Sequence, residues 1–335
     1  MSDAVTPPDD YEGHFVDPVE IVSSSVFIVI GLCTLPIYFR LTLYHWRHGF
    51  KTHYQKIFFV CFTNDLFNHY SQLFRTRLPT WGVNEWFWYV QVGVLPTTCG
   101  LIQSFSLQFQ VLGTLLIAAN RASSLAYPSK YEKFWSINTW RLLAAIALYC
   151  VIYSSPGVTN KYTYNRDSWG YYIPVTRRYN QVTTIMDKVV FPLCISYTFL
   201  ALVLNIYTGY KLLTYSHKMG KPLSRRERVF HFATLLQFFV QLLNTGDLII
   251  TKTQKMSDFW VFFEFQPVFM DLCNFVPIWF LLLISAETRT IVRGKGTGRE
   301  MAVTVMSQGP ILTTAPATKS AWERGTKSAP TTMYS

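Results

Sequence analysis

The sequence has little cysteine, and none of it is placed where a structural framework would need it. The six cysteines each fall inside a long apolar stretch: Cys33, Cys61, Cys99, Cys150, Cys194 and Cys273. Buried cysteine commonly acts as a small hydrophobic side chain. The spacing matches neither a zinc site nor the paired cysteines of a disulfide-rich secreted domain. We therefore expect no structural metal and no disulfide framework.

Histidines at metal-binding spacing and a lysine in the last apolar stretch are also missing. His69 and His231 fall in different apolar stretches, and neither has a second histidine four residues away in the same stretch. A catalytic zinc takes about three protein ligands and keeps one position open, so a membrane metallohydrolase is disfavoured. Residues 259–283 contain no lysine, and a retinal Schiff base needs that amine. We expect no enzyme activity and no cofactor.

What the sequence does contain is seven long apolar stretches. They cover approximately residues 19–38, 57–74, 93–119, 142–158, 189–210, 229–250 and 259–283. A bilayer core about 30 Å thick requires roughly 20 apolar residues in a helix. The pattern predicts an all-α membrane protein with seven transmembrane helices in residues 19–285. Residues 1–18 are then an outer N-terminal segment, and residues 286–335 are a tail.

The distribution of charge gives the orientation. Residues 1–20 carry six acids and no Lys or Arg. The loops after the first, third and fifth stretches and the start of the tail carry eighteen Lys and Arg, against nine on the other side. Positive residues stay cytoplasmic, so we expect the N-terminus outside and the tail inside. The net charge of +11 thus indicates contact with membrane lipid, and we expect no nucleic-acid partner.

The tail, residues 286–335, is rich in Ser and Thr and poor in large apolar residues. Such a composition cannot bury enough apolar surface to fold alone. We expect a disordered cytoplasmic tail. It is either a passive segment or a phosphorylated one that recruits desensitising proteins, and the composition fits both.

Polar residues recur at helical spacing within the apolar stretches. Gln103, Ser106 and Gln110 share one face of the third predicted helix. Asp247 in the sixth stretch and Glu264 in the seventh add polar groups. Polar groups facing lipid are costly, so these five residues should face the bundle interior. We predict that they line a ligand cavity. The alternative is that they join the helices by hydrogen bonds.

Two acids and a proline lie deeper in the stretches. Asp65 is in the second and Asp271 and Pro277 are in the seventh. An ionisable residue inside a membrane suggests a functional site. We predict that these three residues belong to a switch beneath the ligand. In the alternative hypothesis, a transporter, the two acids would carry protons or ions.

The third stretch ends with Asn120-Arg121-Ala122, and Pro128 follows seven residues after the arginine. This spacing resembles that of rhodopsin-like G-protein-coupled receptors, although Asn120 replaces their acid. Because Asn120 offers no carboxylate, we hypothesise that Glu227, at the foot of the sixth helix, pairs with Arg121 in the resting state. The alternative is a solvated Glu227, since a surface ion pair is worth only about 0–1 kcal/mol.

Other features depart from the rhodopsin-like pattern. Residues 159–188 contain no cysteine that could pair with Cys99 at the top of the third helix. The Asn-Pro pair of the seventh helix is split into Asn274 and Pro277. Asp65 resembles the acid that binds sodium in many such receptors, but the first helix lacks the usual asparagine.

Three segments resemble nematode serpentine chemoreceptors, nearest to the gamma and V classes of the Srg superfamily. They are the run from Asn120 to Trp135, the basic Arg225-Arg226-Glu227-Arg228, and Pro277-Ile278-Trp279-Phe280-Leu281-Leu282-Leu283 with Arg289 shortly after. The resemblance covers roughly residues 20–295. It implies a receptor for small molecules or pheromones that activates a heterotrimeric G protein in the plasma membrane, or in the ciliary membrane of sensory neurons. A paralogue that no longer couples is the other alternative.

Overall fold

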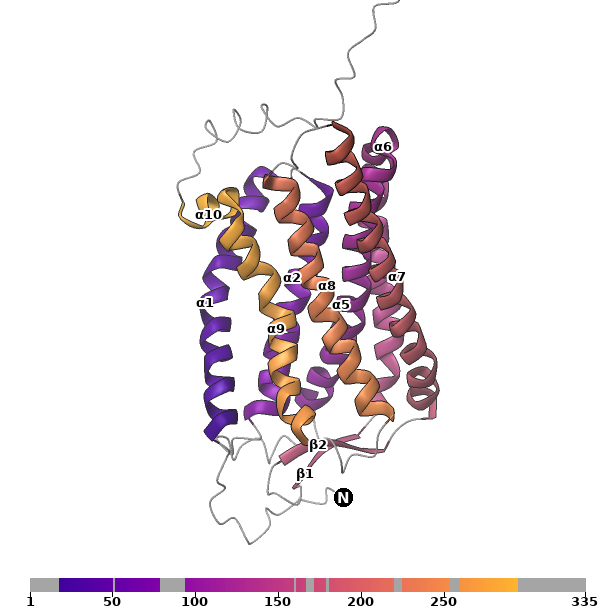
Figure 1. Cartoon of the computed structure of the whole chain (residues 1–335). Coiled ribbons are helices and arrows are strands. Elements are labelled where there is room, and N and C mark those ends of the chain that lie inside the picture. Colours follow the sequence, from indigo (N-terminus) through magenta and orange to yellow (C-terminus); the bar gives the residue numbers. More distant parts are fainter. Residues whose placement is uncertain are drawn as a thin grey trace, which may run out of the picture. The chain divides into compact units, whose positions relative to one another are not determined.

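The computed structural model describes residues 18–50, 52–78, 94–159, 161–166, 172–178, 181–219, 225–253 and 260–294. Seven long helices run side by side (Figure 1). They are α1 (Pro18–His48), α2 (His53–Gln72), α5 (Val94–Ala126), α6 (Pro128–Ser154), α7 (Gln181–Met219), α8 (Arg225–Thr253) and α9 (Trp260–Ile284). Each overlaps one predicted apolar stretch, so the seven-helix prediction is confirmed. Most of the helices are longer than the stretch that predicted them.

Within the described residues, four segments are long and apolar enough to cross a membrane by length and composition alone. They are Ser25–His48, Thr97–Ala126, Pro128–Val158 and Lys188–Thr214, and α8 and α9 contain shorter apolar segments, His231–Leu243 and Met270–Leu283. α2 falls short of this measure because it carries Asn64, Asp65, Asn68 and His69. All four of these side chains are buried, so the polar residues of α2 face the protein and not lipid.

α5 is the central helix, in contact with α2, α6, α7 and α8. Ala118 of α5, Ala201 of α7 and Phe238 of α8 form a buried apolar cluster. At Gly113, an added Cβ would lie 2.6 Å from Cys61 Sγ, so glycine lets α2 and α5 approach here without a change in the Cys61 side chain. Large apolar side chains such as Phe199 on α7 are exposed, as expected for a surface that faces lipid.

Two features go beyond the predicted bundle. The first is a hairpin between α6 and α7, in which β1 (Lys161–Arg166) pairs antiparallel with β2 (Tyr172–Arg178). It lies at the end of the bundle opposite α10 (Figure 1). Short irregular helices, η1 (Leu73–Arg77) and η2 (Ser155–Thr159), extend α2 and α6. Apart from this hairpin, the elements of the described residues are all helical.

The second feature corrects the predicted start of the disordered tail. Residues 286–292 form the helix α10 (Ala286–Val292). Its N-cap is Ser285, whose hydroxyl accepts a hydrogen bond from Thr288 N at 3.1 Å. Ile291 is buried and α10 contacts α1 and α9, which gives a short helix the packing it needs. The compact unit ends at Gly294. Predictions for residues 1–17 and 295–335 lie outside the described residues.

Candidate functional site

A chain of buried polar side chains joins α2, α5 and α9. Gln110 Nε2 donates to Asp65 Oδ1 (3.2 Å) and to Asn274 Oδ1 (3.4 Å). Asn68 Nδ2 donates to the same Asn274 oxygen (3.3 Å). All four residues are buried, and Asn274 is fully so. The structure therefore brings together Gln110, predicted as a ligand residue, and Asp65, predicted as a switch residue.

A second set of hydrogen bonds ties α2 to the backbone of α5. Asn64 Nδ2 donates to the carbonyl oxygen of Ser106 at 3.1 Å, and Ser71 Oγ donates to that of Cys99 at 2.7 Å. Ser106, another predicted ligand residue, is itself buried, whereas Gln103 is only half-buried. Ser106 and Gln110 thus lie at the contact between two helices, as the packing alternative expects.

Asp271 is the centre of a buried charged cluster. His69 Nδ1 donates to Asp271 Oδ1 at 2.8 Å, and an Arg77 guanidinium nitrogen donates to Asp271 Oδ2. All three side chains are almost fully inaccessible to solvent. Burying a charge is costly unless it is paired and hydrogen-bonded, and this carboxylate has two partners. The cluster therefore fastens α9 to the outer half of α2 and to η1, which ends at Arg77.

The contacts of this cluster were not predicted from the sequence. Arg77 is one of the nine Lys and Arg of the outer side, and His69 was weighed as a metal ligand. One signal was present: Arg77 follows His69 by eight residues, which is close to two helical turns. Because η1 is a wider, π-helical turn, regular helical spacing would not have placed the arginine accurately.

α1 packs directly on the charged cluster. A Cβ added to Gly31 would lie 2.6 Å from His69 Nε2 and 3.3 Å from Phe275 Cζ. The His69 and Phe275 rings meet edge to face with 4.5 Å between their centroids. Gly31 is therefore the residue that lets α1 approach this part of α2 and α9.

At the inner end of the bundle, Arg121 of α5 contacts an aromatic ring of α2. Its guanidinium carbon lies 4.3 Å from the centroid of the Tyr54 ring, within the range of a cation–π interaction. Tyr54 is buried. The side chain of Glu227, predicted as the partner of Arg121, lies outside the described residues, so that pairing stays a prediction. Sequence reasoning missed Tyr54, which stands near the start of the second apolar stretch.

The turn between α5 and α6 is held by hydrogen bonds. Tyr127 separates the two helices, and the exposed Pro128 occupies the first turn of α6, where a missing N–H is tolerated. Trp135 Nε1 donates to Ser123 Oγ at 2.8 Å. Tyr131 Oη donates to Asn120 Oδ1 at 3.3 Å. The segment that resembled a chemoreceptor signature is therefore an ordered corner beside Arg121.

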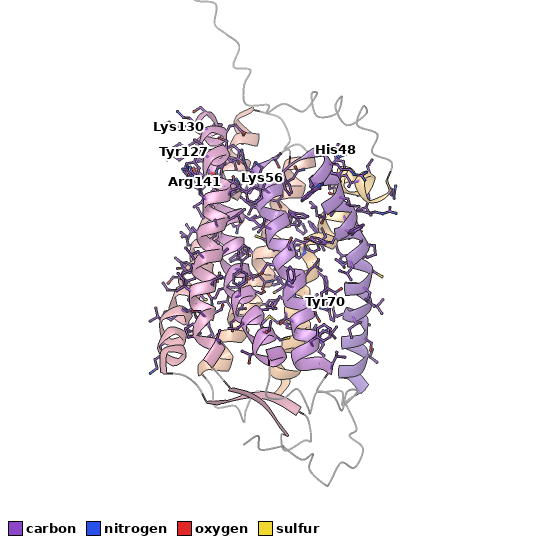
Figure 2. All side chains as sticks on the ribbon, turned by 180° about the vertical axis from the view of Figure 1, so that it is seen from behind. His48, Lys56, Tyr70, Tyr127, Lys130 and Arg141 are labelled. Atoms are coloured by element: carbon purple, nitrogen blue, oxygen red, sulfur yellow. The ribbon has the colours of Figure 1, made fainter. Side chains whose placement is uncertain are left out.

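The same corner is joined to the start of α2. His53 Nε2 donates to Glu132 Oε1 at 3.0 Å, and the Thr139 hydroxyl lies 3.2 Å from His53 Nδ1. Figure 2 shows Tyr127, Lys130, Lys56 and His48 at one end of the bundle, the end that carries the basic loops. Arg121 therefore lies beside side chains of α2, α5 and α6 that are joined to one another by hydrogen bonds.

For some of the remaining predicted residues the structure gives only the helix on which they lie. Asp247 is in α8 and Glu264 is in α9, but their side chains lie outside the described residues. Pro277 is buried within α9. In the part of the chain that the structure describes, no group of three or more His, Cys, Asp or Glu could hold a metal ion.

Seven membrane helices around a polar interior, with an arginine at the inner foot of the third, define the class of seven-helix membrane receptors. The model of the family described as "Serpentine type 7TM GPCR chemoreceptor Srx" matches residues 84–276, more than half of the chain. The chain belongs to this family of G-protein-coupled chemoreceptors, which is not a family of enzymes. The identification as a serpentine chemoreceptor is confirmed, but its placement near the gamma and V classes of the Srg superfamily gains no support. No curated protein matches the sequence.

Proposed function

We propose that this receptor binds an extracellular small molecule in the outer half of its helix bundle and activates a heterotrimeric G protein at its inner face. The observation that carries the proposal is the buried polar chain through α2, α5 and α9. Gln110 binds both Asn274 and Asp65 in this chain. The Asp271 cluster lies about one turn from Asn274 on α9, toward the outer end. Arg121 lies eleven residues below Gln110 on α5, about three helical turns away.

The proposed ligand site lies between the outer halves of α5, α7, α8 and α9. Its predicted residues are Gln103, Ser106, Gln110, Asp247 and Glu264. Because Gln110 is hydrogen-bonded to other helices and Ser106 is buried, we place these two residues in the floor of the proposed site. Gln103 lies one to two turns nearer the outside and is half-buried, so it is the residue of α5 that we expect to touch the ligand.

The proposed switch follows from what must change when α9 moves against α2. Such a movement alters the Asp271 contacts with His69 and Arg77, and with them the Asn274 contacts with Gln110 and Asn68. A ligand shifts this equilibrium only through its difference in affinity for the two arrangements. In the active arrangement Arg121 leaves Tyr54 and is available to the G protein, while the basic inner loops meet an acidic surface of that protein.

The alternative function is ion- or proton-coupled transport by Asp65 and Asp271. The pairing of Asp271 with Arg77 and His69 favours the receptor, because an acid held by two partners is poorly suited to release and rebind ions. A paralogue that binds ligand without coupling is the third hypothesis. In the animal we propose the plasma membrane of sensory neurons or their cilia, with the tail as a docking site for desensitising proteins.

A ligand panel on cells that express the chain with a promiscuous G protein tests the proposal. We expect a calcium or cyclic-nucleotide response to at least one compound, no accumulation of that compound, and no response in the Arg121→Ala variant at equal surface expression. Accumulation that depends on Asp65 or Asp271 would establish the transporter instead. Binding without any second-messenger response in the wild type would establish the non-coupling paralogue.

A further inference from the structure

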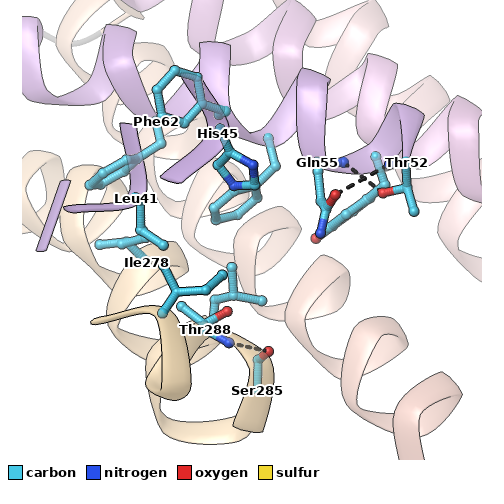
Figure 3. Close-up of a pocket in the computed structure, with 13 residues that line it drawn as sticks. Leu41, His45, Thr52, Gln55, Phe62, Ile278, Ser285 and Thr288 are labelled. Carbon is cyan, nitrogen blue, oxygen red and sulfur yellow. Dashed lines mark hydrogen bonds between the residues drawn. The ribbon is translucent and has the colours of Figure 1, made fainter. Parts of the chain in front are cut away.

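A crevice at the inner end of the bundle is separate from the polar chain. It lies between α1, α2, α9 and α10 and is partly open to solvent (Figure 3). Its walls include Leu41, Phe58, Phe62, Ile278, Leu281 and Ile291. Neither the proposed ligand site nor the buried polar chain uses this space.

Several of the polar groups around the crevice already cap helices, and His45 and Tyr54 are the aromatic polar residues of its wall. Thr52 Oγ1 accepts from Gln55 N, and Gln55 Oε1 accepts from Thr52 N, both at 3.2 Å. Ser285 Oγ accepts from Thr288 N at 3.1 Å. Figure 3 shows these pairs at the edge of the cavity. What the walls offer an occupant is therefore mainly hydrocarbon and aromatic surface, which favours an apolar chain.

The chain segments that form the rim of the crevice are basic. Their described residues within 40–56 and 285–294 include five Lys and Arg and one acid, Glu287. The basic residues are Arg40, Arg47, Lys56, Arg289 and Arg293. A guanidinium nitrogen of Arg40 donates to the carbonyl oxygen of Val292, so the positive charge lies between α1 and α10. On the cytoplasmic side these cations face a leaflet whose lipids are partly anionic.

The helix that forms one wall of the crevice also offers apolar surface on its other side. α1 buries Leu41 at the crevice and exposes Phe39 and Leu43, two residues away on either side, as expected for a helix beside lipid. We propose that the crevice binds an anionic phospholipid of the inner leaflet. One acyl chain lies between Leu41, Phe58 and Leu281, and the phosphate contacts Arg40 and Arg293. An apolar cavity and a cationic rim together match the two halves of such a lipid.

Tyr54 links this site to the signalling face. It lines the crevice, and Arg121 lies over its ring. A bound chain that packs against Tyr54 therefore holds the ring in the position that retains Arg121. This last step rests on the proposed role of Arg121, whereas lipid binding itself does not.

The test uses the full-length receptor in phosphatidylcholine nanodiscs that contain a small fraction of one photoactivatable lipid. The probes are phosphatidylserine and phosphatidylcholine with the same diazirine-bearing acyl chain, and mass spectrometry of peptides locates the cross-links. We expect phosphatidylserine to label the crevice segments of α1, α2 and α9 more than phosphatidylcholine does. A basic residue near an anionic lipid contributes about 1 kcal/mol, or roughly fivefold. Arg40→Gln should therefore lower phosphatidylserine labelling about fivefold and leave phosphatidylcholine labelling unchanged.

Matched variants complete the experiment. Leu281→Trp fills the crevice and should abolish its labelling, whereas Leu213→Trp, on an exposed site of α7, should not. Lys130→Gln, exposed on α6, is the control for Arg40→Gln. Equal labelling of the crevice by both lipids, or labelling confined to the exposed face of α7, would overturn the proposal. If Leu281→Trp does not fold, the Arg40→Gln comparison decides alone. None of these readouts depends on a G protein, so failure here leaves the proposed function standing.

Discussion

Arg121 and Tyr54 form the contact on which resting-state control of the inner face should depend. A cation–π contact is worth about 0.5–2 kcal/mol. Tyr54→Leu removes the ring, so we expect basal signalling to rise about fivefold, whereas Tyr54→Phe keeps the ring and should stay near wild type. Basal second-messenger level per receptor at the surface is the measurement. Glu227→Gln, tested beside them, shows whether the predicted ion pair adds to this control. A wild-type basal level in Tyr54→Leu would mean that the contact only packs the helices.

Gln103 gives a test of the proposed ligand site. Gln103→Leu and Glu264→Gln should each weaken the response to a ligand found in the panel, with surface expression unchanged. A charged ligand should lose more than a neutral one in Glu264→Gln, because charge-assisted hydrogen bonds are roughly twice as strong as neutral ones. Dose–response curves provide the measurement. Curves that coincide with the wild type for both variants would assign these side chains to packing.

The Asp271 cluster should contribute strongly to stability. Removing one partner of a buried ion pair costs about 3–5 kcal/mol, because the other charge stays buried and unpaired. Asp271→Asn should therefore lower the thermal midpoint of the purified receptor sharply. The double variant Asp271→Asn with Arg77→Gln should recover part of that loss, since no charge is then left without its partner. Lys130→Gln, on an exposed position, is the control. Additive losses in the double variant would show that the two residues do not interact.

At the scale of helices, α1 packs closely against α2 and α9 at Gly31, which has no side chain. Gly31→Ala would place a Cβ 2.6 Å from His69 Nε2, and overpacking of this kind costs about 1–3 kcal/mol. Gly246→Ala in α8 meets nothing within 4 Å and should be neutral or slightly stabilising, since alanine is the better helix former. Thermal unfolding of the two variants compares them directly. Equal midpoints would mean that His69 moves aside without cost.

The helices could be predicted from the sequence, but much of what joins them could not. Long apolar stretches report burial in lipid directly, which is why seven helices were found. Which residue a side chain contacts on another helix depends on how each helix is rotated about its axis and how deep it lies in the membrane. The periodicity of the sequence gives neither. Asp65 and Gln110 were each recognised as interior residues, yet their contact was not. Tyr54 was missed because an aromatic residue near a helix end usually belongs to the membrane interface. α10 was missed because seven residues are too few for a clear helical pattern.

For the whole molecule, the charge distribution makes the orientation testable. Eighteen Lys and Arg lie in the inner loops and the start of the tail, against nine on the outer side, and short basic loops remain in the cytoplasm. An epitope tag before Asp3 should therefore bind antibody on intact cells, and a tag after Ser335 should bind only after permeabilisation. The same cells with both tags on one chain provide an internal control for expression. The reverse labelling pattern would turn Arg121 and the basic loops away from any G protein and would contradict the proposed function.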